Sequence, residues 1–353
     1  MLDFAGFGLA TNLVAFAVAA VFVWLAGTRL TRYADAISSA TGIGQAVIGI
    51  VLLAGVTSLP EIGVTATASI AGNAQLAVNN LFGSIALQVA LLAVVDFFIG
   101  RRALTAVVPE PTILLEGSLN IILISAAAAA MIVGDVGFLG IGLWAWGSLL
   151  AYIACVWVLS KAEGRRPWLV ARDGRVDREL MEEEAESGGE DHDTALAILI
   201  AKTVAVAAVI LAAGFVLAGS GDAIAEQTGL GASFVGFVLV AFATSLPELS
   251  TALAAARRGL YTMAISDILG TNLINIALIF LVDLLDAGEP VIGRMDDFAV
   301  FGALLAVVLT GLFLAGIAER RDRSILRMGY DSVLVLLVYA GGVTLLYSLR
   351  QGS

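Results

Sequence analysis

Two residue types on which many soluble enzymes depend are almost absent from this chain of 353 residues. It has one cysteine, Cys155, and one histidine, His192. A single cysteine excludes a disulfide framework and any zinc site built on several cysteines. Because the one histidine lies in a polar stretch, neither a His-Glu-x-x-His metal motif nor a Ser-His-Asp triad is present.

Charged residues are also scarce. They make up 14% of the chain and hydrophobic residues 59%, against about 25% and about 45–50% in soluble domains. The mean hydropathy is +0.97. A soluble fold of this composition would have too few polar side chains to cover its surface. The net charge of −11 argues against a nucleic-acid partner. We therefore expect an all-α membrane protein, with the lipid bilayer as its surroundings.

Apolar runs long enough to cross the hydrocarbon core, about 20 residues each, recur ten times. They predict transmembrane helices over 8–30, 42–70, 75–98, 113–133, 138–160, 195–218, 232–256, 261–285, 297–318 and 329–349. The one long polar segment, 161–193, separates the fifth run from the sixth. We expect a first five-helix unit at 1–160, an acidic cytoplasmic linker at 161–193, and a second five-helix unit at 194–353.

The distribution of lysine and arginine predicts the orientation. Loops after the odd-numbered runs contain 16 of the 19 cationic residues and leave only Lys202, Arg294 and Arg350 elsewhere. The positive-inside rule places those loops in the cytoplasm and both termini outside. The many arginines and two lysines, Lys161 and Lys202, are typical of a GC-rich prokaryote. We expect a multi-pass protein of a prokaryotic cytoplasmic membrane.

The chain contains an internal repeat. Residues 35–96, shifted by 187 positions onto 222–283, give 23 identities in 62 ungapped positions. The motif Thr-Ser-Leu-Pro-Glu occurs at 57–61 and again at 244–248. An odd number of helices per unit inserts the second unit upside down relative to the first. Inverted repeats are typical of transporters, whose sites lie at the membrane midplane where interrupted helices meet.

The two Thr-Ser-Leu-Pro-Glu motifs lie near the middle of the second and seventh runs. Pro60 and Pro247 have no N–H for the carbonyl four residues earlier, and a bound cation can satisfy such a carbonyl. A glutamate at mid-membrane costs at least about 2.5–3.5 kcal/mol, so Glu61 and Glu248 require a partner. Two glutamates with hydroxyl and carbonyl oxygens provide the hard ligands that Ca²⁺ prefers.

Polar residues also recur every four positions in the third and eighth runs, which keeps each set on one helix face. These residues are Asn80, Ser84 and Gln88, and Asp267, Thr271 and Asn275. Small polar residues of this kind also join membrane helices by hydrogen bonds. Asp267 is harder to explain by packing, because it is a carboxylate six residues into an apolar run.

These residues carry a family resemblance. The segment Phe242–Glu248, followed by Gly-Thr-Asn-Leu-Ile-Asn at 270–275, resembles the second α-repeat of the calcium/cation antiporter superfamily, in its sodium/calcium exchanger branch. The segment 57–61 with Gly83-Ser84 resembles the first α-repeat. The likeness covers some 120 residues. Ten helices with both termini outside also agree with this family.

The resemblance implies a role for each matching residue. Glu61 and Glu248, with the carbonyls of Thr57 and Thr244, would form the calcium site. The flanking sodium sites would use Ser58, Ser245, Ser84 and Thr271, with backbone at Ala54 and Ala241. Gln88 and Asn275 would occupy the central positions. The transported ions would be Ca²⁺ and Na⁺, with no bound cofactor.

The chain departs from the family pattern at several positions. The first repeat has Gly83-Ser84-Ile85 where Gly-Ser-Asn is usual, and Gln88 stands where asparagine or aspartate is usual. The Gly-Asn that opens these helices in the family is replaced by Asn79-Asn80 and Ser266-Asp267. Asp267 is an additional acid that could carry a proton, so exchange of Ca²⁺, or of a monovalent cation, against H⁺ is an alternative.

Two other functions are compatible with parts of the sequence. Gly-Ser-Gly-Asp at 219–222, with Tyr330-Asp331, matches the aspartate motifs of intramembrane proteases. Their order is reversed, however, and the repeat mate of Asp222 is Asp35, which has no such motif. A calcium sensor or channel could use the same glutamates, but inverted repeats around a midplane site favour alternating access over an open pore.

Overall fold

The structure is a computed structural model of the chain. It describes residues 4–99, 102–108, 110–162, 171–172, 175–176, 195–228, 235–286, 288–320, 324–325 and 327–349. Most of the predicted linker 161–193 therefore lies outside the described residues. The same is true of the first residues of the predicted helix 232–256.

Helices dominate the described residues. The long ones are α1 (Leu9–Thr41), α5 (Ala74–Ile99), α7 (Thr112–Val133), α8 (Leu143–Ala162), α10 (Leu196–Gln227), α14 (Tyr261–Leu285), α15 (Asp297–Glu319) and α16 (Tyr330–Leu349). Shorter helices are α2 (Gln45–Val47), η1 (Ile48–Leu53), α3 (Ala54–Thr57), α4 (Leu59–Ile70), α6 (Leu104–Val107), η2 (Val235–Val240), α12 (Ala241–Thr244), α13 (Leu246–Arg257) and η3 (Ile292–Arg294).

Three two-residue hairpins are the exceptions to the all-helical prediction. They pair β1 (Gly137–Phe138) with β2 (Ile141–Gly142), β3 (Ala171–Arg172) with β4 (Arg175–Val176), and β5 (Ser324–Ile325) with β6 (Met328–Gly329). The prediction of a helix from residue 138 was therefore wrong by five residues. Leu139 and Gly140 have φ values of 54° and 81°, which a helix cannot accommodate.

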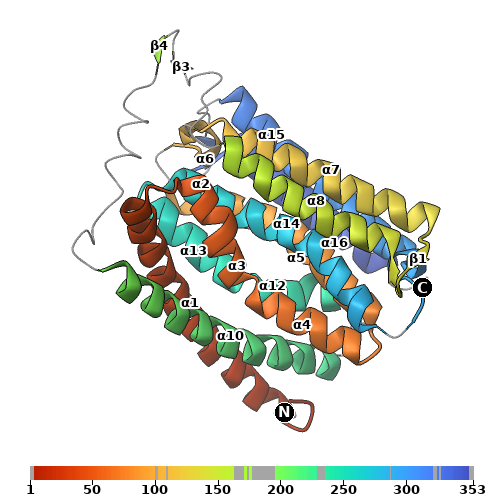
Figure 1. The fold of residues 1–353 in the computed structure, drawn as a ribbon. Coiled ribbons are helices and arrows are strands. Elements are labelled where there is room, and N and C mark those ends of the chain that lie inside the picture. The colour runs from red at the N-terminus through yellow and green to blue at the C-terminus, as the bar shows by residue number, and fades with distance from the viewer. Residues whose placement is uncertain are drawn as a thin grey trace.

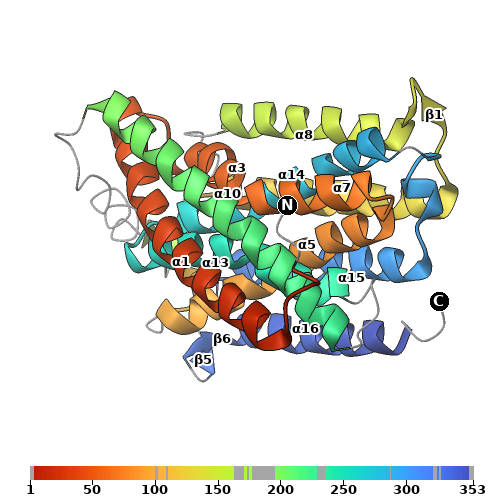
Figure 2. The same cartoon turned by 90° about the horizontal axis from the view of Figure 1, so that it is seen from below.

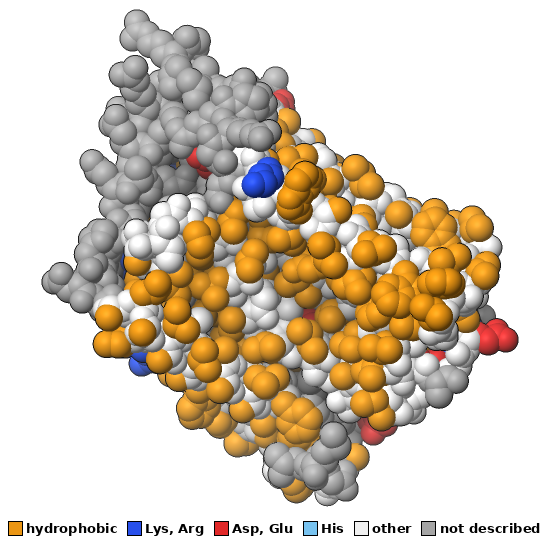
Figure 3. Space-filling view, viewed as in Figure 1, with side chains coloured by type: hydrophobic (Ala, Val, Ile, Leu, Met, Phe, Trp, Pro, Cys, Tyr) orange, Lys and Arg blue, Asp and Glu red, His pale blue; other side chains and the backbone are white. Residues whose placement is uncertain are grey.

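Eight helices of the described residues are long and apolar enough to cross a membrane, and a bent pair makes a ninth if it is counted as one span. Hydrophobic side chains cover most of the face shown in Figure 3. On α1 the exposed fractions of Val14 and Phe22 are 63% and 55%. Large apolar side chains turned outward along a whole helix are expected where the surrounding solvent is lipid.

The helices are arranged in two groups around a buried pair. Helices α5 and α14 pack against each other in the interior, and α7, α8, α15 and α16 pack around them, with α8 and α16 at opposite edges of the bundle (Figure 2). Helices α1 and α10 run next to each other and cross the bundle obliquely (Figures 1 and 2). Helix α1 begins and α16 ends at the end of the bundle opposite β3 and β4.

The offset of 187 residues found in the sequence extends to the element bounds. Adding it to η1, α3 and α4 reproduces the bounds of η2, α12 and α13, and adding it to α8 reproduces those of α16. The packing repeats as well, because α1 contacts α13 as α10 contacts α4. The structural repeat therefore includes α8 and α16, the last long helix of each half. The ungapped alignment of 35–96 with 222–283 ends before both of them.

Each half contains one interrupted helix. A π-helical turn, η1 or η2, is followed by one short α-helical turn, α3 or α12. The helix then breaks at Ser58 or Ser245, two residues before the proline of the motif. Segments Gln45–Thr57 and Leu59–Ile70 meet at 46°. Proline lacks the N–H that would continue the ladder, so the break falls where the sequence predicts it. Both motifs thus lie at a helix break in the interior.

Close backbone contacts hold the interrupted helices against α5 and α14. A side chain at Gly83 would collide with the backbone of Phe237 in η2, and one at Gly270 would lie 2.7 Å from the Cα of Ile50 in η1. Neither site has room for a Cβ atom. Each central helix therefore packs against the interrupted helix of the other half.

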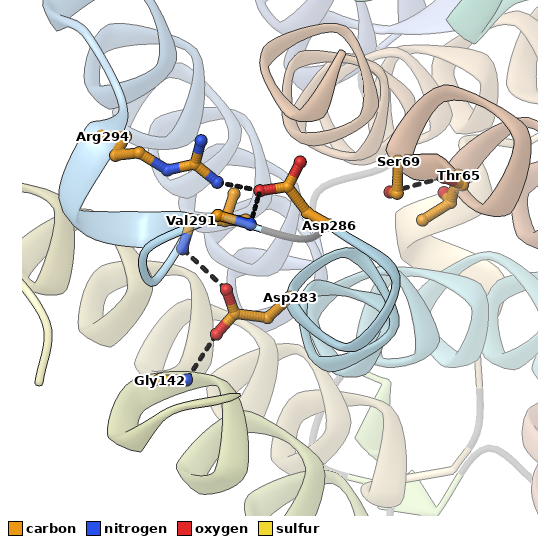
Figure 4. A network of polar contacts seen from close by, with 8 residues as sticks. Thr65, Ser69, Gly142, Asp283, Asp286, Val291 and Arg294 are labelled. Atoms are coloured by element: carbon orange, nitrogen blue, oxygen red, sulfur yellow. Dashed lines mark hydrogen bonds and ion pairs between the residues drawn. The ribbon is translucent and has the colours of Figure 1, made fainter. Parts of the chain in front are cut away.

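Two aspartates connect the central helices to the loops at opposite ends of the bundle. Asp96, at the end of α5, accepts hydrogen bonds from the backbone N–H of Leu104 (2.6 Å) and Gly329 (2.7 Å). Asp283, at the end of α14, accepts from Val291 (2.7 Å) and Gly142 (2.5 Å), as Figure 4 shows. The residues of the two sets correspond at the offset of 187. Asp96 corresponds to Asp283, Leu104 to Val291, and Gly142 to Gly329. The identity between Asp96 and Asp283 therefore has a structural role.

We predict that Asp96→Ala and Asp283→Ala each lower the free energy of unfolding by about 2–4 kcal/mol, because each leaves two buried N–H groups without an acceptor. The losses should add in the double variant, since the two sites do not share a partner. Thermal unfolding of the purified protein measures both. Asp297→Ala, at an exposed position of α15, is the control and should change stability by less than about 1 kcal/mol. Equal losses in all three variants would contradict the assignment.

Candidate ion-binding site

All thirteen residues that the sequence selects as candidate ligands are fully buried. Each has an exposed fraction of 0%: Ala54, Thr57, Ser58, Glu61, Ser84, Gln88, Ala241, Thr244, Ser245, Glu248, Asp267, Thr271 and Asn275. They lie on the two interrupted helices and on α5 and α14. The elements that hold the motifs are therefore the same ones that pack together at the glycine contacts.

Several hydrogen bonds join the candidate residues across the two halves. The hydroxyls of Ser84 and Thr244 are 3.5 Å apart, and those of Thr57 and Thr271 are also 3.5 Å apart. These two contacts are equivalent under the offset of 187. The Gln88 amide also donates to the Ser245 hydroxyl at 3.2 Å. The structure thus brings both motifs and both polar stripes into one cluster.

The two motif glutamates lie near each other within this cluster. Glu248 is close enough to Glu61 and Asp267 for direct electrostatic interaction, and Thr57 and Thr244 lie beside the glutamate of the opposite half. None of the four glutamate oxygens has a hydrogen bond to any described residue. Buried carboxylates normally have partners. The four oxygens are therefore available to a ligand that carries positive charge.

Several buried amides of α5 and α14 also lack partners among the described residues. Both polar atoms of Asn79, Asn80, Asn272 and Asn275 are unpaired, as is the carbonyl oxygen of Gln88. Asn275 therefore lies on the same polar stripe of α14 but forms no side-chain hydrogen bond with a described residue of the cluster. Its repeat mate Gln88 reaches Ser245, because the glutamine side chain is one methylene longer.

Two of the four backbone carbonyls predicted as ligands, those of Ala54 and Ala241, already have partners. The Ala54 carbonyl accepts from the Ser58 N–H at 2.9 Å and from the Ser58 hydroxyl at 2.7 Å. The Ala241 carbonyl accepts from the Ser245 N–H at 3.0 Å and from the Thr244 hydroxyl at 3.2 Å. An ion at either carbonyl would displace these side-chain hydroxyls or share the oxygen with them.

Asp267 makes the two halves of the cluster different. Its carboxylate accepts from the Thr57 hydroxyl at 3.4 Å and from the Thr251 hydroxyl of α13. The repeat mates of Asp267 and Thr251 are Asn80 and Val64, so the first half has neither the acid nor its donor. The additional charge of the site therefore lies toward the end of α14 that follows α13.

A fourth acid near this cluster, besides Glu61, Glu248 and Asp267, was not predicted from the sequence. Glu116, four residues after the start of α7, has an exposed fraction of 0%, and its Oε2 accepts from the Ser266 hydroxyl at 2.9 Å. Its Oε1 has no partner among the described residues, and it lies within electrostatic range of Asp267. An ionisable residue inside an apolar run was a sufficient signal, but Glu116 belongs to no repeated motif.

No three aspartate, glutamate, histidine or cysteine side chains of the described residues are grouped so that they could hold a metal ion by themselves. An ion at Glu61 and Glu248 would therefore also depend on hydroxyl, amide and carbonyl oxygens. Ligands of that kind are typical of Ca²⁺ and other hard cations.

Two cavities lie beside the interrupted helices. One, of about 330 Å³, lies between α4 and α10, and the other, of about 240 Å³, between α13 and α1. Some of the residues that line the first cavity have repeat mates in the lining of the second. Gly63, Thr67, Leu211, Phe215 and Gly219 correspond at the offset of 187 to Ser250, Ala254, Trp24, Thr28 and Arg32. The two cavities are therefore related in part by the repeat.

Comparison with known proteins identifies relatives over most of the chain. The model of the family described as "Sodium/calcium exchanger protein" matches residues 11–161 and 198–348. The inner membrane protein YrbG of Escherichia coli is 26% identical over 309 residues, covering 86% of this chain and 88% of YrbG. The sodium/calcium exchanger MaX1 of Methanosarcina acetivorans is 33% identical over 119 residues, a third of each chain.

A putative antiporter, CaxA of Alkalimonas amylolytica, is 24% identical over 333 residues, 93% of this chain and 96% of its own. Among solved structures, the sodium-calcium exchanger NCX_Mj has a TM-score of 0.67 at 19% identity and covers 96% of this chain and 99% of its own. At that identity the likeness establishes the fold.

We predict that Glu116→Gln changes the free energy of unfolding by less than about 1 kcal/mol, because glutamine keeps an acceptor for the Ser266 hydroxyl. Glu116→Leu, the matched control, removes the acceptor and should lower the free energy of unfolding by about 1–3 kcal/mol. Thermal unfolding measures both variants, and equal losses in the two would contradict the prediction.

Proposed function

The chain belongs to the sodium/calcium exchanger family, and we propose that it is an antiporter that moves Ca²⁺, or a similar divalent cation, in exchange for Na⁺. A transporter family also accounts for the lack of an enzyme motif. The protein is a multi-pass membrane protein, and relatives such as the inner membrane protein YrbG support a place in a prokaryotic cytoplasmic membrane.

The observation that carries the proposal is the pair of unpartnered glutamates at the two helix breaks. Four carboxylate oxygens of Glu61 and Glu248 are buried without hydrogen bonds to described residues. Two negative charges in an apolar bundle are balanced by one divalent cation. The neighbouring hydroxyls raise the number of oxygens toward the six to eight that Ca²⁺ takes.

We assign the surrounding residues by their place in the cluster. Glu61 and Glu248, with the carbonyls of Thr57 and Thr244, would hold the divalent ion. The sodium sites would flank it and use the hydroxyls of Ser58, Ser84, Ser245 and Thr271 with the carbonyls of Ala54 and Ala241. The contacts Ser84–Thr244 and Thr57–Thr271 support the assignment, because each joins a sodium ligand to a threonine of the opposite motif.

Transport would proceed by alternating access in a fold of ten helices arranged as two inverted repeats, with both termini outside. The two repeat-related cavities support this mechanism, since an inverted repeat places equivalent cavities at opposite faces of the membrane. The cavity between α4 and α10 would lead outward and the cavity between α13 and α1 toward the cytoplasm. An ion would leave the glutamates toward one side at a time.

Exchange against H⁺ is the second candidate function, and Asp267 is the observation that favours it. Gln88 and Asn275 are neutral, so the centre has no charge beyond Glu61 and Glu248. Asp267 adds a third carboxylate, hydrogen-bonded to Thr57 of the first motif. A buried carboxylate that can take up and release a proton provides a means of coupling.

Glu61→Gln and Glu248→Gln should each reduce calcium exchange by about 100-fold or more, because each removes one of the two charges that balance a divalent ion in a buried site. Uptake of radioactive calcium into proteoliposomes with an imposed sodium gradient measures the loss. Glu226→Gln, the same exchange at an exposed position of α10, is the control and should leave uptake unchanged. Normal uptake by either single variant would refute the shared site.

The same vesicles identify the driving ion. We expect calcium uptake to follow a sodium gradient and to increase from about pH 6 to pH 9, because only a deprotonated carboxylate binds the cation well. Asp267→Asn should make this pH profile flatter. Uptake that follows a proton gradient without sodium would replace Na⁺ by H⁺ as the exchanged ion, and an unchanged profile in Asp267→Asn would remove Asp267 from the mechanism.

A further inference from the structure

The segment before α1 turns one aromatic ring into the interior. Residues 4–8 form a turn in which the Phe7 N–H donates to the Phe4 carbonyl at 3.2 Å. Phe4 has an exposed fraction of 8%, whereas residues 5–8 are exposed, Phe7 at 39%. A phenylalanine that is buried in an otherwise exposed segment removes its apolar surface from solvent by packing against another part of the fold.

Phe4 packs into the cavity between α4 and α10. It belongs to the lining of that cavity, as do Phe215 and Gly219 of α10. The ring centroids of Phe4 and Phe215 are 6.2 Å apart, within the range of a favourable aromatic pair. A Cβ atom at Gly219 would lie 2.5 Å from the Phe4 ring. Glycine at position 219 therefore leaves the room that the ring occupies.

Two side chains hold the segment in this position. The amide of Asn12, a fully buried residue of α1, donates to the carbonyls of Phe4 at 3.0 Å and Phe7 at 3.4 Å. Gln227, the last residue of α10, donates to the Phe7 carbonyl at 2.8 Å. The segment is thus attached to both α1 and α10. A short segment held by one ring and a few hydrogen bonds can open while the rest of the fold stays intact.

The cavity that Phe4 enters extends to the ion-binding cluster. Its lining includes Pro60 at the beginning of α4 and Ala71 directly after the end of that helix. The cavity therefore follows α4 along its length and reaches the residue next to Glu61. Among the described lining residues only Thr67 and Asn73 have polar side chains. Apolar constrictions exclude water and ions by dewetting, so a phenylalanine ring in this cavity opposes their passage.

The cavity between α13 and α1 lacks such a ring among its described lining residues. That lining comes from α1, from α13 and from Arg258 directly after α13. The repeat mate of Gly219 is Arg32, so the position that admits the ring in one cavity has a long side chain in the other. The repeat mate of Phe4, Asp191, is not aromatic and lies outside the described residues. The contact of Phe4 is therefore a property of one cavity that the repeat does not explain.

We propose that residues 4–8 form a lid on the cavity between α4 and α10, and that the Phe4 ring closes it. The structure shows the closed state, in which the ring lies against α10. Opening moves the ring out of the cavity and breaks the hydrogen bonds from Asn12 and Gln227. The lid itself does not depend on what the protein transports. Its effect on exchange rests on the proposed function, under which this cavity leads outward and a closed lid slows the passage of cations.

The test measures how fast a water-soluble thiol reagent reaches the cavity in the purified full-length protein. Cys155, the one native cysteine, is replaced by alanine, and a reporter cysteine is introduced by Gly63→Cys. Gly63 lines the cavity, and a Cβ atom there meets nothing within 4 Å. Phe4→Ala should raise the rate of labelling by a positively charged methanethiosulfonate about tenfold, because burial of the ring favours the closed lid.

Matched variants separate the lid from a general loosening of the fold. Gln227→Ala releases the segment without altering the cavity lining and should raise the rate about threefold. Phe4→Leu keeps an apolar side chain in the cavity and should stay close to the wild-type rate. Phe22→Ala removes the same ring from an exposed position of α1 and should have no effect. A second reporter, Ala254→Cys in the lining of the other cavity, should react equally fast with and without Phe4→Ala.

An unchanged rate at Gly63→Cys in both Phe4→Ala and Gln227→Ala overturns the lid, as does an equal increase at Ala254→Cys. Gln227→Ala alone decides the matter if thermal unfolding shows that Phe4→Ala does not fold. Calcium uptake into proteoliposomes, measured separately, should be faster in Phe4→Ala. Faster labelling with no uptake in any variant would refute the proposed function and support the lid. Faster labelling with unchanged uptake would refute the effect of the lid on exchange.

Discussion

The burial of two carboxylates inside an apolar bundle is the constraint on which the rest of the structure depends. Glu61 and Glu248 are fully buried, and water is not available there to solvate them. Each follows directly after a helix break, where the regular hydrogen-bond ladder is interrupted by proline. The bundle must therefore hold two interrupted helices in place without the ladder. It does so through the close contacts of Gly83 and Gly270.

The two halves share an architecture but differ in charge. Element bounds, the glycine contacts and the Asp96 and Asp283 clamps recur at an offset of 187. Asp267 has no acidic mate, and Glu116 corresponds to Ala303. A fold made of two equivalent halves can alternate between two equivalent states. Charges present in one half only are what can make these states unequal in energy.

The acids and the arginines of this asymmetry lie in the same part of the molecule. Thr251, which donates to Asp267, is on α13 next to Ser250. Ser250 lines the cavity between α13 and α1, as do Arg32, Arg257 and Arg258. Packing of α1 on α13 is tight there, because a side chain at Gly27 would collide with Ser250. Asp267 and the cavity are therefore connected through adjacent residues of one helix.

The sequence by itself determined the membrane-spanning segments, the repeat, the helix breaks and the family. Eight of the ten predicted helices begin within three residues of the observed ones, because apolar length and proline act locally. The helix predicted from residue 138 begins five residues later, and the start of the helix predicted from residue 232 lies outside the described residues. Asp96 and Asp283 were visible as one identity of the repeat, but their clamping role was not, since their partners include residues distant in the chain. The tertiary structure alone decided which halves meet at Ser84–Thr244, that Glu116 lies near Asp267, and that Arg32 joins Arg257 and Arg258. These contacts depend on how helices separated by more than 100 residues pack together, and no local pattern encodes that packing.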